Sequence, residues 1–225
     1  MNPTTEAQTP APYKPYAFTL LWLALIAQAI WMGLQHFSLH ESWSSMSYPL
    51  MYAAPFLFLA ATYGRVRWIA SLLRLPVAAA FLDAVADRLG LLGPPGAPGV
   101  GWGDFSHFIA YTATVNSFMP HAVIPVLAIL ATIGETTFGI GLLLGVRLRI
   151  VATGSAVLLF LFATAMIISG FSQFAYGVYL MAAGTLALST VDASLCSVDA
   201  ILRKQKIKLL RPQQLTLNET AQPEN

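Results

Sequence analysis

The chain has 225 residues, of which 56% are hydrophobic and 10% are charged, and its formal net charge is +2. A soluble globular domain carries roughly 25% charged residues, so a soluble fold of this size is excluded. The small net charge offers no basic surface for nucleic acid. The single cysteine excludes a disulfide scaffold and a thiolate metal site. We predict an all-α integral membrane protein that contacts lipid and binds no nucleic acid.

A helix needs about 20 apolar residues to cross a membrane, and six segments of the chain come near this length. The second segment is the shortest and contains Pro55. No cleavage site of small residues follows the first segment, so we expect a retained helix and not a signal peptide. The predicted spans cover about Ala17–Phe37, Tyr48–Tyr63, Trp68–Leu92, His121–Leu144, Ile150–Ser169 and Phe174–Val191.

The distribution of lysine and arginine predicts the orientation of these spans. With six spans, 11 of the 12 basic residues fall on the side of the two termini. Basic residues favour the cytoplasmic side, so both termini are expected to be cytoplasmic. Arg88 is the one basic residue on the outer side.

Two segments outside the spans are expected to lie on the membrane surface. Residues 93–103 form a Pro/Gly loop, and the apolar spacing of 104–118 then predicts an amphipathic helix on the outer face, with Asp104 as its N-cap. A basic helix is expected over 192–210 on the cytoplasmic side, before a polar tail from Pro212.

Glu135 lies near the middle of the fourth span, within ATIGETTFGIGLLLG. Ionisable side chains at membrane depth are costly and are therefore candidates for function. Thr132, Thr136 and Gly139 share its helical face, which predicts a polar and small stripe toward the bundle interior. Glu135 then either handles protons or a ligand, or serves as a structural carboxyl bonded to a neighbouring helix.

Asp83 and Asp87 lie one turn apart on the third span, and Arg88 follows directly. Neighbours in sequence do not face each other on a helix, so Arg88 is expected to pair across helices. Its expected partner is Glu135, Asp104 or an anionic ligand. The alternative is a buried ion pair that only fixes helix packing.

All four histidines are expected on the outer side, together with two acidic residues that could complete a metal site or a proton relay. Their spacing matches no metal signature, and histidines at a membrane interface are also common without a ligand. The residues are His36, His40, His107 and His121, with Glu41 and Asp104.

The fourth span carries the pattern of a known family. Pro120 and Pro125 lead into LAILATIGETTFGIGLLLGVRLR, which contains Glu135, several glycines and a basic stop at Arg147. The next span opens with small residues in IVATGSAVLLF. Residues 65–191 therefore resemble the four-helix core of the DoxX-like family of small bacterial membrane proteins. The other expected parts are a tail at 1–15, an extra transmembrane hairpin at 16–64 and a cytoplasmic segment at 192–225.

The resemblance implies a bacterial inner-membrane subunit of a redox system, because related DoxD-type proteins are a subunit of a thiosulfate:quinone oxidoreductase. Other DoxX-like proteins associate with partners in thiol and superoxide defence. We expect no covalent cofactor, a quinone as the bound redox molecule, and a redox partner protein. Glu135 is the expected proton-handling residue, assisted by Asp83. Arg88, Asp87 and His107 are expected to place a quinone headgroup or a small anion.

Two other functions fit the same sequence. One is a membrane scaffold that anchors a partner protein, favoured by the lack of cofactor motifs and by the small residues available for helix packing. The other is a small transporter, in which acidic residues at membrane depth are also expected.

Overall fold

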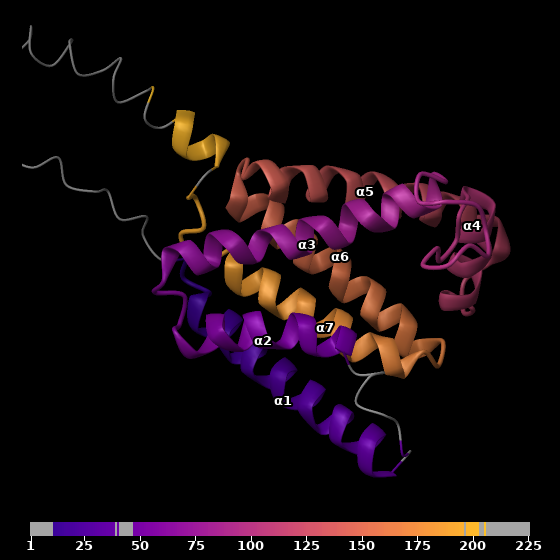
Figure 1. Ribbon diagram of the computed structural model, residues 1–225, viewed down its shortest axis with the longest axis horizontal. Coiled ribbons are helices and arrows are strands. Elements are labelled where there is room, and N and C mark those ends of the chain that lie inside the picture. Colours follow the sequence, from indigo (N-terminus) through magenta and orange to yellow (C-terminus); the bar gives the residue numbers. More distant parts are fainter. Residues whose placement is uncertain (1–10, 39, 41–46, 196, 203–204, 206–225) are drawn as a thin grey trace, which may run out of the picture.

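Every regular element in the described part of the chain is a helix. The computed structural model describes residues 11–38, 40, 47–195, 197–202 and 205. Most connections are short, and the longest one leads into α4 (Figure 1). The elements are α1 (Lys14–Ser38), α2 (Ser47–Ala61), α3 (Arg67–Arg88), α4 (Phe105–Val115), the 3-10 helix η1 (His121–Val123), α5 (Ile124–Leu144), α6 (Leu148–Ile168) and α7 (Ser172–Leu188).

Four of the helical stretches are long and apolar enough to cross a membrane. They are Lys14–Ser38, Arg67–Arg88, His121–Leu144 and Leu148–Ile168, and they match the predicted first, third, fourth and fifth spans. The predicted second and sixth spans correspond to α2 and α7, which have 15 and 17 residues. Both are shorter than the about 20 residues of a full crossing. These four helices indicate a helical membrane protein.

The third span ends earlier than the sequence pattern predicts, at Arg88 and not at Leu92. Gly90 takes a positive φ of 74°. Its N–H donates to Asp87 O at 2.9 Å, and Leu91 N–H donates to Ala86 O at 2.9 Å. These two bonds form a Schellman motif, which ends a helix and satisfies its last carbonyl groups. The apolar Leu91 and Leu92 therefore belong to the following loop.

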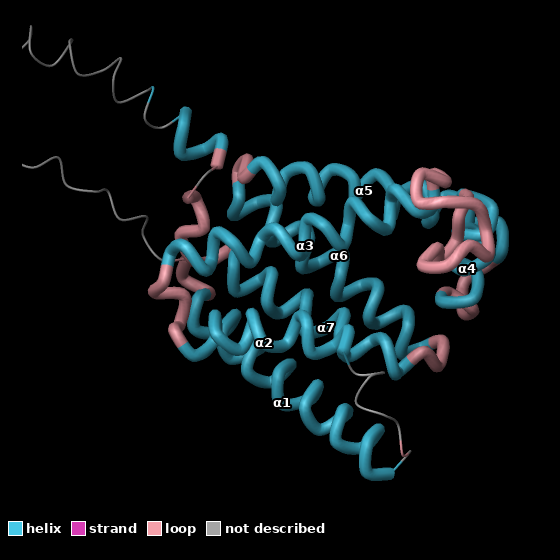
Figure 2. The backbone as a smooth tube through the Cα atoms, in the orientation of Figure 1, coloured by secondary structure: helices cyan, strands magenta, loops and turns pink. Residues whose placement is uncertain are grey.

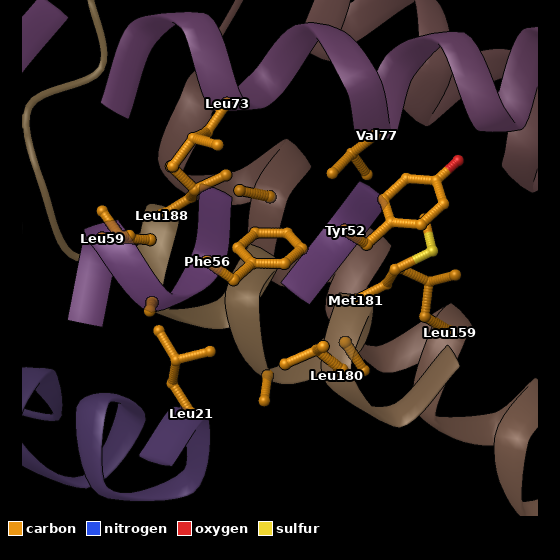
Figure 3. Close-up of a cluster of buried hydrophobic side chains, with 14 of the residues drawn as sticks. Leu21, Tyr52, Phe56, Leu59, Leu73, Val77, Leu159, Leu180, Met181 and Leu188 are labelled. Carbon is orange, nitrogen blue, oxygen red and sulfur yellow. The ribbon is translucent and has the colours of Figure 1, made fainter. Parts of the chain in front are cut away.

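The main core joins α2, α3 and α7. α7 packs against α1, α2 and α6, while α3 packs against α5. Figure 3 shows aromatic and aliphatic side chains of α2 meeting those of α3 and α7. α7 is therefore surrounded largely by other helices. The buried core includes Tyr52, Phe56 and Leu59 of α2, Leu73 and Val77 of α3, and Leu180, Met181 and Leu188 of α7.

A second, smaller apolar cluster lies at one end of α3 and α5. Loop 93–104 and α4 cover this end of the bundle (Figure 2). We call residues 93–115 the cap, and the end they cover the cap end. The cluster consists of Phe108, Ala128 and Ala131, with Trp102, Phe105, Ile109, Tyr111 and Phe162 packed around them.

The predicted helix over 104–118 is present as α4, with the expected N-cap. The Asp104 Oδ1 atom accepts a hydrogen bond from His107 N–H at 2.8 Å. The helix ends at Val115, before the expected Phe118. One of its faces packs on α5, so α4 is not only a surface helix. The buried residues of that face are Phe108, Thr112 and Val115.

At the opposite end of the bundle, the chain after α7 is tied to α3. Arg74 is only 4% exposed. Its Nε donates to Ser71 O at 3.1 Å, and its Nη2 donates to Leu195 O at 3.3 Å. Arg67 forms an ion pair with Asp192 at 2.7 Å. Two arginines of α3 thus hold the segment that follows the last helix.

The basic helix expected over 192–210 is described only in part. Residues 192–195 are not helical, whereas 198–202 are helical. The polar tail from Pro212 and most of the segment at 1–15 lie outside the described residues.

Close packing between α2 and α7 depends on Gly184. A Cβ atom at this position would overlap with the ring of Phe56, which is only 2% exposed. We expect Gly184→Ala to destabilise the protein by about 1–3 kcal/mol through overpacking. The measurement is unfolding in mixed micelles with increasing sodium dodecyl sulfate, followed by circular dichroism.

Gly33→Ala is the matched control, since a Cβ there has no atom within 4 Å. Alanine in a helix is favoured over glycine by about 1 kcal/mol, so this variant should equal or exceed the wild type in stability. Equal stability of the two variants would contradict the proposed contact between α2 and α7.

Candidate functional site

The candidate site is a buried ion pair between α3 and α5. Arg88 lies in the last turn of α3 and is 1% exposed. Its Nη2 donates to the Glu135 carboxylate, its Nη1 donates to Thr132 Oγ1 at 3.0 Å, and its Nε donates to Ala84 O at 2.9 Å. Of the three expected partners of Arg88, the structure shows Glu135. All three nitrogen atoms of the guanidinium therefore donate to groups of the chain itself.

Glycine at position 139 allows α3 to approach α5 at this site. A Cβ at Gly139 would come within 2.9 Å of Leu82 Cδ2 and 3.2 Å of Phe81 Cβ. The expected small stripe beside Glu135 thus faces α3. Small residues allow helix backbones to approach closely in membranes.

Thr132 belongs to the same stripe, and its hydroxyl has two roles. It donates to Ala128 O at 2.8 Å while its oxygen accepts from Arg88. Since a hydroxyl has one donor and two acceptor positions, this geometry fixes the direction of both bonds. Thr132 therefore completes the environment of the guanidinium without adding a charge.

Aromatic side chains of the cap cover the guanidinium. The Cζ atom of Arg88 lies 3.7 Å from the centroid of the Phe108 ring and 5.2 Å from that of Trp102. A cation over an aromatic face is attracted by about 0.5–2 kcal/mol, with the larger values at desolvated sites. The negative charge of Glu135 also reaches Tyr111: burial raises the pKa of this phenol, and the nearby carboxylate raises it further.

Asp87 holds the cap on the bundle. Its carboxylate accepts from Gly101 N–H at 2.8 Å, from Gly103 N–H at 2.9 Å and from Trp102 N–H at 3.2 Å. A Cβ at Gly101 would lie 2.8 Å from the Asp87 Oδ2 atom, so a larger residue would crowd the carboxylate. Asp87 thereby places Trp102 beside Arg88, and its role is to position the cap.

The other residues predicted for the site lie away from the ion pair. Asp83 is exposed on α3, so the structure does not bring it to Glu135. The His107 Nδ1 atom lies 2.9 Å from the Asp104 carboxylate, and this pair is exposed on the surface of α4. Hydrogen bonds from Ser106, from His107 N–H and from the His107 ring hold the pKa of Asp104 well below its usual range.

The histidines do not form a metal site within the residues that the structure describes. No group of three histidine, cysteine, aspartate or glutamate side chains there could hold a metal ion. His40 and His121 are exposed, and His36 is half-buried. Glu41 lies outside the described residues.

Sequence reasoning missed the aromatic residues and Thr132 as partners of Arg88. Trp102 lies in a Pro/Gly loop whose path has no periodic pattern, so its contact with α3 could not be inferred from spacing. Phe108 belongs to the apolar face predicted for 104–118, and that face was the available signal. An apolar face of this kind indicates contact with lipid as well as it indicates contact with Arg88, so the pattern could not distinguish the two.

The two charges of the ion pair should be unequal in their effect on stability. Glu135→Leu leaves a buried guanidinium that stays charged in proteins, so we expect a loss of about 3–5 kcal/mol. Arg88→Met leaves a carboxylate that a proton can neutralise, so its loss should be smaller. The free energy of unfolding in mixed micelles checks the order of the two variants.

The double variant Arg88→Met/Glu135→Leu provides the control. A buried pair replaced by apolar residues is often neutral or stabilising, so the double variant should recover most of the stability lost in Glu135→Leu. Additive losses in the double variant would show that Arg88 and Glu135 are not coupled, and would contradict the expectation that an unpaired buried charge causes the loss.

The role of Asp87 can be measured on the cap amides. Asp87→Ala removes the acceptor of three N–H groups, and a hydrogen bond to a charged group contributes about 1.5–3 kcal/mol. We expect hydrogen exchange at 101–103 to accelerate at least tenfold, as measured by mass spectrometry. Asp83→Ala, one turn away and exposed, should leave these amides unchanged; acceleration in both variants would contradict a specific anchor.

Comparison of the chain with models of protein families, with curated proteins and with solved structures finds no match. The resemblance to the DoxX-like family therefore stays a prediction based on the residues around the fourth span. The buried pair of Arg88 and Glu135 under an aromatic cap is the feature of this structure from which a function can be argued.

Proposed function

We propose that this chain is an integral membrane subunit of a quinone-linked redox system, with its site at Arg88 and Glu135. One observation carries the proposal. The face of the Arg88 guanidinium is covered by the flat aromatic ring of Phe108, with 3.7 Å between Cζ and the ring centroid. A quinone headgroup has the same flat shape, and it can occupy this face when the cap moves away.

The side chains around this face suit the chemistry of a quinone. Arg88 can donate a hydrogen bond to a carbonyl oxygen of the headgroup. The carboxyl of Glu135 can accept or supply a proton. Reduction of a quinone to a quinol takes two electrons and two protons. The chain has one cysteine and no other redox-active side-chain motif, so the electrons come from a partner protein or from a reduced sulfur anion such as thiosulfate.

The proposal includes six membrane crossings, with α2 and α7 as the shorter ones. Both termini then lie in the cytoplasm of a bacterium and the cap faces outward, as the distribution of basic residues favours. Packing of α3 on α5, α5 on α6 and α6 on α7 is compatible with a DoxX-like four-helix core over 65–191.

A scaffold is the second candidate function, and the closed state of the site favours it. Arg88 is 1% exposed and all three of its nitrogen atoms already donate within the chain. A buried network with every group satisfied can hold a rigid surface for a partner without binding any small molecule.

Quinone bound to the purified protein distinguishes the two functions. We expect near-stoichiometric quinone in solvent extracts of the wild type, detected by a reduced-minus-oxidised ultraviolet spectrum. Glu135→Gln keeps the shape of the side chain but should reduce the bound quinone and thiosulfate-dependent quinone reduction at least tenfold. Circular dichroism establishes that the variant remains folded.

Asp83→Asn is the matched control, because it changes a carboxylate of α3 that lies away from the pair; it should retain quinone and activity. Two results together would favour the scaffold over the redox function. The folded wild type would contain no quinone, and deletion of this chain would destabilise a partner protein in the membrane.

A further inference from the structure

On the side of the bundle formed by α1, α6 and α7, away from the ion pair, the helices leave an apolar groove of about 440 Å³. α7 packs against both α1 and α6 and forms the floor. Alanines leave space for the groove, among them Ala24 and Ala27 of α1 and Ala182 and Ala183 of α7. The volume is near the lower end of the range of about 300–1,000 Å³ typical of small-ligand sites.

The groove opens toward the hydrocarbon of the membrane. Leu23 of α1 is 58% exposed, and Val157 and Phe160 of α6 are both 54% exposed. Along α7 the lining runs from Tyr176 to Leu186, which corresponds to about 15 Å of helix. This is half of a hydrocarbon core of about 30 Å, so the groove matches an alkyl chain from one leaflet.

Two buried polar atoms lie beside the end of the groove that is formed by Ala27 and Tyr176. Within the described residues, Gln28 Oε1 and Trp31 Nε1 are buried without a hydrogen-bond partner. Gln28 is 2% exposed, and its Oε1 faces Gly177 of α7, 4.0 Å from where a Cβ would lie. The Trp31 ring stacks on Tyr176, with 5.0 Å between the ring centroids. Two residues one helical turn apart on α1 thus carry an acceptor and a donor that have no partner in the part of the chain that the structure describes.

Unsatisfied buried polar groups are rare and point to a missing water or ligand. The lining carries no charged side chain, so the missing group is neutral. A hydroxyl group has the chemistry that both atoms require, since it can donate to Gln28 Oε1 and accept from Trp31 Nε1. We propose that the groove binds a single-chain membrane lipid with an uncharged hydroxyl head, with the chain along α7 and the hydroxyl between Gln28 and Trp31.

The position of the head agrees with the depth of a lipid head. Tyr176 lies near the beginning of α7, and tryptophan and tyrosine gather where a membrane meets water. The stacked rings of Trp31 and Tyr176 therefore place the hydroxyl toward one leaflet surface and the chain toward the middle of the bilayer. This site does not depend on the quinone function proposed for Arg88 and Glu135.

Bromine quenching of Trp31 fluorescence tests the site. Replacing Trp22, Trp43, Trp68 and Trp102 by phenylalanine leaves Trp31 as the only tryptophan of the full chain. A dibrominated long-chain alcohol in phosphatidylcholine vesicles should quench it in a saturable manner. The methyl ether of the same chain accepts a hydrogen bond but cannot donate one, and should bind about three- to tenfold more weakly.

Substitutions in α1 test whether the alcohol binds in the groove and whether Gln28 accepts its hydrogen bond. Gln28→Leu should remove the preference for the alcohol over the ether. Ala27→Leu fills the end of the groove and should weaken both compounds, whereas Ala29→Leu, exposed on the same helix, should change neither. Equal quenching by alcohol and ether in the parent protein, as expected for a bridging water, would overturn the proposal, as would unchanged binding in Ala27→Leu.

The four tryptophan replacements could unfold the protein. In that case, the hydrogen bond to Gln28 is tested by the retention of a radiolabelled long-chain alcohol on the purified protein with its native tryptophans. The wild type should retain the alcohol and Gln28→Leu should lose at least two-thirds of it. Equal retention by the two proteins would overturn the proposal.

Discussion

The charge of Arg88 is the constraint on which the cap end of this protein depends. A guanidinium stays charged in proteins and brings five N–H donors with it, so burying it in an apolar bundle requires acceptors on every side. The chain supplies one acceptor for each nitrogen atom of the guanidinium, from α3 itself through Ala84 and from α5 through Thr132 and Glu135. The last two are within reach because Gly139 allows α3 and α5 to approach closely.

The same turn of α3 also determines where the cap lies. Asp87 and Arg88 are neighbours in sequence and project to different sides of the helix, so one bonds the loop while the other bonds α5. The loop bonds place Trp102 beside the guanidinium, and α4 adds Phe108, whose ring centroid lies 5.0 Å from that of Trp102. Two adjacent charges of opposite sign thus join a transmembrane helix to two separate parts of the chain.

The sequence was sufficient for the features that depend on local pattern. Apolar length predicted the four long helices, and Asp104 predicted the beginning of α4. The sequence was not sufficient to distinguish residues of the same type that lie in different environments of the fold. Asp83 and Asp87 are equivalent by spacing, yet one is exposed and the other binds three backbone N–H groups of a loop without periodicity. Gly90 by itself indicates the end of α3, but the apolar residues that follow it suggest that the span continues.

The two regions of interest differ in what a ligand would have to displace. At the cap end, every nitrogen of Arg88 already donates within the protein, so a headgroup must replace Phe108 or one of the bonds to α5. Binding there requires the cap to move, and the three bonds to Asp87 oppose that movement. Beside the groove, Gln28 Oε1 and Trp31 Nε1 have no partner within the described residues, so a hydroxyl adds hydrogen bonds without breaking any. A single-chain lipid with a hydroxyl head can therefore bind without rearrangement of the cap. The binding of any ligand to Arg88, in contrast, depends on the conformation of residues 93–115.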